Sequence, residues 1–279
     1  MNYIEKIIER QKEIIGKETD GDYIKSMNPQ DNLLRTINNW SDIEKDFRGS
    51  QGGELKKDKD GRKKFCSVRS SSALCVNNFA PFKESRQEIH FIYNGNSNFD
   101  KAKFEMPLST GISTPNLDFY LENINIIIGF ESKFTEHFEK NIAHTKANLC
   151  KYFMREELYY LPRLFDGLIL HYINCTDKMY LDVAQLIKHL IGLINNKKNR
   201  KAILVYIYWE PINWKEISIF EQHRKELDDF AKRIEKFEDV ITFKSLSYSD
   251  FWKEYENCEL LKEHIKLMRG RYNFAIDKE

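Results

Sequence analysis

The chain has 279 residues, of which 41% are hydrophobic and 31% are charged, so it can bury a core and does not have the composition of a disordered protein. The 44 Lys and Arg residues balance the 43 Asp and Glu residues to a formal charge of +1, so bulk charge gives no sign of nucleic-acid binding. No apolar run approaches the ~18 residues of a transmembrane helix, and the charged N-terminus lacks the apolar core of a secretory signal, so we expect a cytoplasmic protein without a membrane anchor.

The first third of the chain is predicted to consist of helices and one long loop. Apolar residues at helical spacing predict helices over 2–16 and 31–47. The Gly-rich and highly charged stretch 49–64 shows no periodicity, which predicts a mobile surface loop. A short helix is expected over 70–79, because a serine run can cap it and Pro81 can end it.

Strands and helices alternate over the rest of the chain. Strands are predicted over 101–108, 117–121, 124–134, 202–209 and 239–244, and helices over 135–158, 178–195, 217–236 and 248–268. The run 124–134 is apolar until its last residues, which fits a strand covered on both faces, and Glu122-Asn123 before it suits a tight turn. This order predicts an α/β fold with a mixed central β-sheet flanked by α-helices.

Three polar residues stand at the ends of two of these strands. Asp118 begins one strand, while Glu131 and Lys133 end the next and project to the same face, because side chains alternate along a strand. If the two strands pair as a hairpin, Asp118 approaches both. Two converging carboxylates repel each other unless a cation lies between them, and oxygen ligands favour magnesium or manganese. Together with a lysine that can polarise a water, this pattern indicates metal-assisted attack on a phosphodiester.

The tripeptide E-x-K is weak evidence by itself. It occurs twice, as Glu54-Leu55-Lys56 and as Glu131-Ser132-Lys133, and only the second ends a buried strand beside an acidic partner. A solvated, charged strand end remains the alternative explanation. The five cysteines are odd in number and form no C-x-x-C pair, so neither a disulfide framework nor a zinc cluster is expected.

The segments PNLD at 115–118 and IIIGFESKF at 126–134 resemble the PD-(D/E)XK nuclease superfamily, which has the restriction-endonuclease-like fold. Other segments resemble a bacterial group of type II restriction endonucleases within it: GGEL at 52–55, SSSALCVNNF at 70–79, GFESKFTEH at 129–137, DVAQLIKHLIGL at 182–193 and YWEP at 208–211. The resemblance covers roughly residues 50–250. We therefore expect a nuclease domain over 49–279 and an N-terminal helical extension over 1–48 that packs on it.

The resemblance implies a mechanism for the three residues. Asp118, Glu131 and the main-chain carbonyl of Ser132 would bind Mg²⁺, for which Mn²⁺ would substitute. Lys133 would orient the attacking water and help to deprotonate it, leaving a 5′-phosphate and a 3′-hydroxyl.

Three further residues are candidates for the same site. Glu54, after two glycines, matches the extra acidic residue that superfamily members bring from an upstream helix; an ordinary loop glutamate is the alternative. Glu105, in the strand before Asp118, is a second acidic candidate. Gln185 lies on a helix with Lys188 on the same face, and in related nucleases a glutamine on this helix lines the active site. A polar stripe on an amphipathic helix explains both equally well.

Residues that could contact DNA precede the strands. Hydroxyl groups and helix N-termini suit phosphate oxygens, so the candidates are Ser70, Ser71, Ser72 and Asn77, together with Lys188. Capping of a helix explains the serines equally well. The cluster Arg62, Lys63, Lys64 and Arg69 could form a basic edge, although a solvated charge run is the more common explanation.

These patterns favour a Mg²⁺-dependent endonuclease acting on double-stranded DNA, of the type II-like restriction class. Cleavage of both strands at a symmetric site favours a homodimer, and a methyltransferase encoded nearby would be its partner. Two alternatives remain open: a repair, mobile-element or structure-specific nuclease of the same fold, and a non-catalytic DNA-binding subunit of a defence system. The recognition sequence cannot be derived from spacing.

Overall fold

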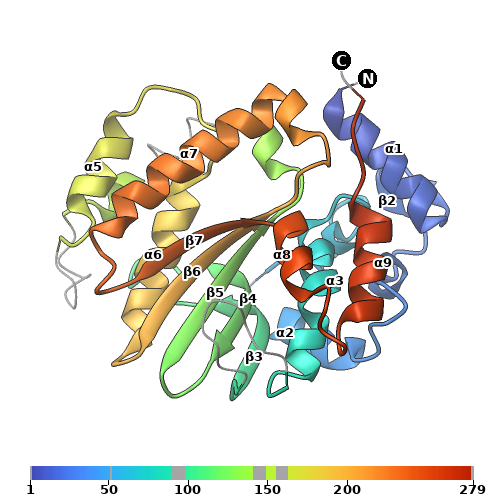
Figure 1. The fold of residues 1–279 in the computed structure, drawn as a ribbon, viewed down its shortest axis with the longest axis horizontal. Helices are drawn as coiled ribbons and strands as arrows, with labels where there is room; N and C mark the ends of the chain where they lie inside the picture. The colour runs from blue at the N-terminus through green and yellow to red at the C-terminus, as the bar shows by residue number, and fades with distance from the viewer. Residues whose placement is uncertain (1, 51, 89–97, 141–148, 155–162, 278–279) are drawn as a thin grey trace.

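A computed structural model describes residues 2–50, 52–88, 98–140, 149–154 and 163–277. Its centre is one twisted five-stranded sheet with helices packed on both faces (Figure 1). The strands lie in the order β3 (Lys101–Pro107), β4 (Asn116–Glu122), β5 (Ile126–Lys133), β6 (Lys201–Tyr208) and β7 (Thr242–Ser247). The pairs β3–β4 and β4–β5 are antiparallel, whereas β5–β6 and β6–β7 are parallel, which confirms the predicted mixed sheet.

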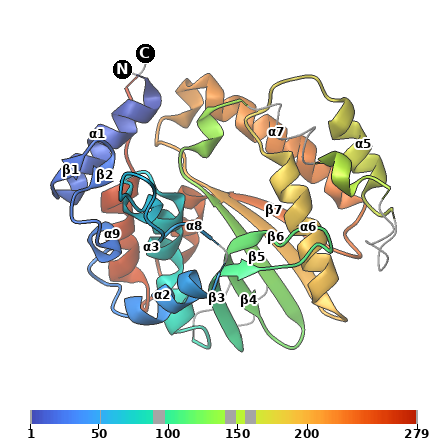
Figure 2. The ribbon, with the colours of Figure 1, turned by 180° about the vertical axis from the view of Figure 1, so that it is seen from behind.

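The helices form two layers, which Figures 1 and 2 show from opposite sides. One layer contains α1 (Tyr3–Ile15), α2 (Trp40–Gly49), α3 (Ser71–Glu84), α8 (Tyr248–Tyr255) and α9 (Lys262–Tyr272). The other contains α5 (Asp166–Asn174), α6 (Val183–Lys197) and α7 (Ser218–Glu235). A short hairpin of β1 (Thr19–Asp20) and β2 (Tyr23–Ile24) precedes α2. No helix within the described ranges is both long and apolar enough to cross a bilayer.

The central strand β5 is covered on both faces, as its apolar sequence predicts. Ile128 and Phe130 belong to the core on the α3 side, whereas Ile127 belongs to the core on the α6 side. Gly129 is required between them, because a Cβ atom there would lie 2.4 Å from Leu117 Cδ1 on β4. The absence of this side chain therefore lets β4 and β5 pack closely beside Asp118.

The pairing of strands β3 and β4 is interrupted at one position. Their register pairs Phe104 with Phe119 and then Met106 with Leu117, so Glu105 and Asp118 stand opposite each other where the ladder is interrupted. Glu105 has a φ of 49°, in the left-handed region that a residue with a side chain seldom adopts. Such strained backbone costs about 1–3 kcal/mol and is typically retained at functional sites.

Two expectations about helix ends were wrong. The predicted helix 31–47 begins only at Trp40, because Asn32 is buried and its amide donates to the carbonyls of Phe65 and Ser67 at 2.8 and 2.7 Å. The predicted helix 70–79 does not stop before Pro81 but runs to Glu84. The carbonyl of Asn77, which Pro81 cannot pair with, contacts His264 Nε2 at 2.6 Å instead.

Other boundaries also differ from expectation. The predicted helix 248–268 is divided into α8 and α9 by turns at 256–261, and helix α5 was not anticipated. Much of the predicted helix 135–158 lies outside the described residues, and its described parts contain short 3₁₀ turns at 136–138 and 150–152. Within the predicted loop 49–64, Lys57 and Lys63 form a β-bridge, so this stretch contains one backbone pairing of its own.

Candidate active site

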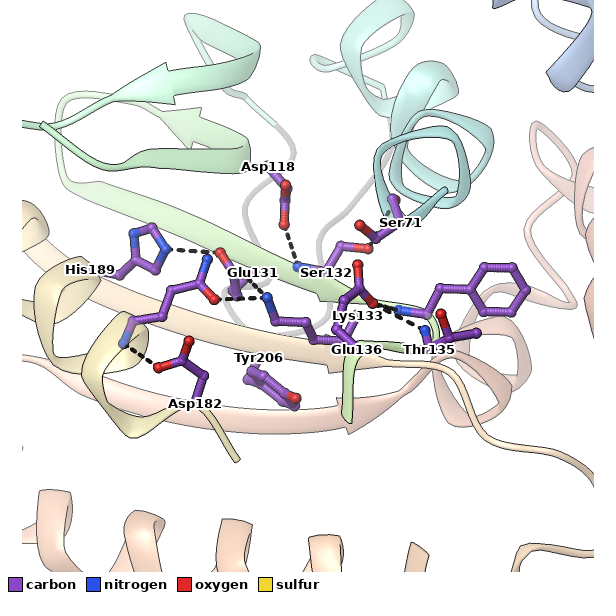
Figure 3. Close-up of polar contacts among 12 residues, drawn as sticks. Ser71, Asp118, Glu131, Ser132, Lys133, Thr135, Glu136, Asp182, His189 and Tyr206 are labelled. Carbon is purple, nitrogen blue, oxygen red and sulfur yellow. Dashed lines mark hydrogen bonds and ion pairs between the residues drawn. The ribbon is translucent and has the colours of Figure 1, made fainter. Parts of the chain in front are cut away.

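The candidate active site lies where β4 and β5 separate, next to the first turns of α6 (Figure 3). Glu131 and Lys133 project from β5 toward α6, as their alternation predicts. Ser132 points to the opposite face, where its hydroxyl lies 2.7 Å from the Tyr248 hydroxyl. The structure thus brings the three residues singled out by the sequence to one place.

Asp118 is anchored to the neighbouring strand. Its Oδ2 accepts a hydrogen bond of 2.6 Å from the main-chain N–H of Ser132, so the carboxyl spans the gap between β4 and β5. Burial raises the pKa of this carboxyl well above its usual value, and the charges of Glu131 and Glu105 raise it further. Asp118 therefore carries its negative charge at an electrostatic cost when no cation is bound.

Glu131 and Lys133 form a buried ion pair. Glu131 Oε1 lies 2.6 Å from Lys133 Nζ, and the two side chains are only 3% and 13% exposed. Burial opposes ionisation of Glu131, but Lys133 and then His189 outweigh it and lower its pKa to about 2. Burial also opposes the charge on Lys133, but Glu131 outweighs it and raises the lysine pKa above its ordinary value. Both groups are charged at neutral pH.

Helix α6 supplies two side chains to this pair. Asp182 caps the helix by accepting a 2.9 Å hydrogen bond from the N–H of Gln185, and Gln185 Oε1 accepts one of 2.8 Å from Lys133 Nζ. This contact supports the candidacy of Gln185. One turn later, His189 Nε2 lies 2.8 Å from Glu131 Oε2. In the sequence, the only sign of a role for His189 is its position four residues after Gln185.

A second group of carboxyls lies beside Asp118. Glu105 is 6% exposed, and its Oε2 accepts a 3.0 Å hydrogen bond from Asn116 Nδ2. Burial, followed by the charges of Glu54 and Glu131, outweighs that bond and raises its pKa to about 7. Burial also raises the pKa of Glu54, which Lys64 and the Ser72 hydroxyl lower in part. Glu105 therefore influences the charge of Asp118 directly, whereas Glu54 acts on Glu105.

The donor set suits a divalent cation. No three Asp, Glu, His or Cys side chains of the described residues form a complete metal site. However, the charge of Glu131 raises the cost of ionising Asp118, and Glu131 Oε2 is buried and makes no regular hydrogen bond among these residues, although His189 Nε2 lies 2.8 Å from it. Two carboxylates fit a hard cation that takes its remaining ligands from main-chain carbonyls, water and substrate.

The proposed DNA contacts have different environments. Asn77 is fully buried, and its amide Nδ2 donates to the Asn32 carbonyl and the Tyr272 hydroxyl, so a DNA contact at Asn77 does not fit the structure. Ser70 caps α3 through a 3.1 Å bond from the N–H of Ala73. The remaining candidates are buried Ser72 and the partly exposed Ser71 and Lys188.

The stretch that the sequence offered as a basic edge is partly neutralised by acidic partners. Arg62 lies 3.1 Å from Asp20 and Arg69 lies 3.0 Å from Asp22, and both aspartates belong to the short β1–β2 hairpin. Lys63 donates to the carbonyl of Met27 at 2.9 Å. These contacts favour a structural role for three of the four basic residues.

The chain was compared with models of protein families. The family model described as "Restriction Endonuclease associating with ARP" matches residues 8–273. The match begins within α1 and so includes the N-terminal segment that the resemblance to 50–250 left out. No curated protein and no solved structure matches the chain.

Proposed function

Because the chain belongs to the restriction endonuclease family described as associating with ARP, we propose that it is a metal-dependent endonuclease that hydrolyses phosphodiester bonds of double-stranded DNA. The observation that carries the proposal is the convergence of Asp118, Glu131 and Lys133 at the separated ends of β4 and β5, with Gln185 against the lysine. A solvated strand end would not keep an ion pair this deeply buried.

In this proposal, Asp118, Glu131 and the main-chain carbonyl of Ser132 hold Mg²⁺, and Mn²⁺ substitutes for it. When bound, the cation neutralises charge that develops on the scissile phosphate. The hydrogen bond from Ser132 N–H keeps Asp118 turned toward β5, the strand that carries Glu131. Preorganisation of this kind lowers the cost of assembling the site during the reaction.

Lys133 acts as a charged hydrogen-bond donor in this scheme. Glu131 raises its pKa, so it holds its proton at neutral pH and is poorly suited to accept one from water. Of the two roles that the superfamily suggests, orienting the water and deprotonating it, the first agrees better with this environment. Gln185 accepts one of the lysine N–H bonds and thereby fixes the direction of the ammonium group.

The remaining parts of the proposal follow from the restriction class. The products are a 5′-phosphate and a 3′-hydroxyl, the enzyme acts in the cytoplasm as a homodimer, and a methyltransferase encoded nearby protects the host DNA. We divide the chain into a helical extension over 1–48 and a nuclease domain over 49–279 on which it packs. In support, α1 contacts α9 through Gln11 and Arg271.

Incubation with plasmid DNA and Mg²⁺ tests the proposal, with Asp118→Asn as the matched variant. Discrete fragments from the wild type and none from Asp118→Asn would support a restriction enzyme. Nicking or smearing would favour a repair or structure-specific nuclease of the same fold. Binding of DNA without cleavage by either protein, in Mg²⁺ and in Mn²⁺, would contradict an enzymatic role and favour a DNA-binding subunit.

A further inference from the structure

His189 is buried on α6 with a ring nitrogen beside the carboxylate of Glu131, a contact that packing alone does not require. It lies on the buried side of α6 and is 1% exposed, and its Nε2 atom lies 2.8 Å from Glu131 Oε2. The other carboxylate oxygen of Glu131 is taken by Lys133. Neither ring nitrogen of His189 makes a hydrogen bond of regular geometry among the described residues, so the close approach of Nε2 to the Glu131 carboxylate is an ion-pair contact.

The contact arises from a match between helix and strand spacing. Residues four apart on a helix are separated by about 6 Å along its axis, and residues two apart on a strand by about 6.6 Å. Helix α6 can therefore place Gln185 against Lys133 and His189 against Glu131 at the same time. Figure 3 shows the second of these pairs. The two pairs are consistent with α6 running opposite to β5, because the earlier helix residue meets the later strand residue.

The same match assigns different tasks to the two helix residues. Gln185 presents an oxygen to an ammonium group, whereas His189 presents a ring nitrogen to a carboxylate. A carboxylate side chain has several rotamers, and only some of them direct an oxygen toward Asp118 across the gap. With one oxygen held by Lys133 and the other by His189, Glu131 keeps a single orientation.

We propose that His189 is a positioning residue that fixes the carboxylate of Glu131 in the orientation that accepts the divalent cation. This inference rests on the proposed function, since it assigns His189 a part in the same site. Residues that orient metal-binding side chains in this way typically change metal affinity or activity about 10–100-fold when they are replaced.

Two substitutions of His189 separate positioning from packing. The amide nitrogen of a glutamine reaches the place of the histidine Nε2 atom, whereas that of an asparagine reaches only the place of Nδ1. His189→Gln therefore restores the contact with Glu131 and His189→Asn does not, although both introduce the same amide. Exposed His171 on α5 provides a control through His171→Asn.

The experiment measures binding of Mn²⁺ alone to the full chain without DNA, by electron paramagnetic resonance of free Mn²⁺. Thermal unfolding in EDTA reports whether each variant is folded. We expect His189→Asn to weaken Mn²⁺ binding about 10–100-fold, His189→Gln to restore most of the affinity, and His171→Asn to match the wild type. In cleavage assays, the Mg²⁺ concentration for half-maximal rate should rise in His189→Asn, and saturating Mg²⁺ should recover most of the rate.

Folded His189→Asn and His189→Gln variants that bind Mn²⁺ as tightly as the wild type would overturn the role of His189 and leave the proposed function intact. Equal losses in both variants would also overturn it, because the reach of the side chain would then be irrelevant. A wild-type chain that binds no Mn²⁺ and cleaves no DNA would instead overturn the proposed function, and the role of His189 with it. Should His189→Asn fail to fold, His189→Leu serves as the variant without a donor, judged against His189→Gln by the same outcomes.

Discussion

Replacing Glu105 by glutamine should make the protein more stable at alkaline pH. Glu105 is buried beside Asp118, and its pKa is raised from 4.5 to about 7, first by burial and then by Glu54 and Glu131. A glutamine has nearly the same shape and can still accept the hydrogen bond from Asn116 Nδ2. The substitution therefore removes one charge while it keeps the packing and the bond.

The sign and size follow from proton linkage. A carboxyl whose pKa is higher in the folded than in the unfolded state favours folding below its unfolded pKa, and this contribution is lost as the pH rises through the folded value. For Glu105 the loss falls between about pH 4.5 and above pH 7. At 1.36 kcal/mol per pKa unit, the free energy of unfolding should fall by roughly 2–3 kcal/mol between pH 5 and pH 8 because of this group.

Urea denaturation in EDTA at pH 5 and pH 8 measures the effect. The wild type should lose roughly 2–3 kcal/mol more than Glu105→Gln over this interval, and at pH 8 the variant should be the more stable protein. Glu254→Gln, at an exposed position on α8, serves as a control that should follow the wild type. Equal pH dependence of the free energy of unfolding in the wild type and Glu105→Gln would refute the claim that burial raises the pKa of Glu105.

Three further predictions concern the framework of the site, and urea denaturation checks each. Gly129→Ala should cost about 1–3 kcal/mol by overpacking against Leu117, and less when combined with Leu117→Ala; additive effects would contradict the close contact. Arg271→Met should cost about 2–4 kcal/mol, because it leaves the buried side-chain oxygens of Gln11 and Asn32 without their donor; a change below about 0.5 kcal/mol would contradict it. His264→Ala should lower the free energy of unfolding by about 1–3 kcal/mol, because the Asn77 carbonyl loses its contact with His264 and Pro81 has no N–H to replace it. This loss should be smaller in a Pro81→Ala background, where residue 81 can donate to that carbonyl.

The convergence of the three candidate active-site residues could be predicted because their signal is local. Asp118, Glu131 and Lys133 stand at the ends of two strands joined by a short turn, so alternation along a strand and the length of the turn suffice to bring them together. The mixed sheet could be predicted from the order of strands and helices along the chain, and the cover on both faces of β5 from its apolar run. Gln185 required the resemblance, because its distance from Lys133 along the chain is 52 residues.

The features that the sequence could not reveal depend on contacts between distant segments. A histidine at helical spacing fits a packed core as well as a carboxylate partner, so only the position of α6 against β5 distinguishes His189. Asn32 sits within a helical pattern, yet its amide binds carbonyls 33 and 35 residues away and prevents the helix from starting there. The burial of Asn77, a candidate for DNA contact in the sequence, also arises from distant segments, namely α9 and the segment before α2.

Single-turnover cleavage of plasmid DNA in Mg²⁺ by Lys133→Ala and Lys56→Ala tests the central claim most directly. Both variants remove the lysine of an E-x-K tripeptide, but Lys56 is exposed while Lys133 is paired with Glu131 and Gln185. The cleavage chemistry proposed for this site predicts that Lys133→Ala lowers the rate by about 100-fold or more. The rate of Lys56→Ala should stay within about threefold of the wild-type rate. Cleavage by Lys133→Ala at the wild-type rate would contradict the assignment of the active site.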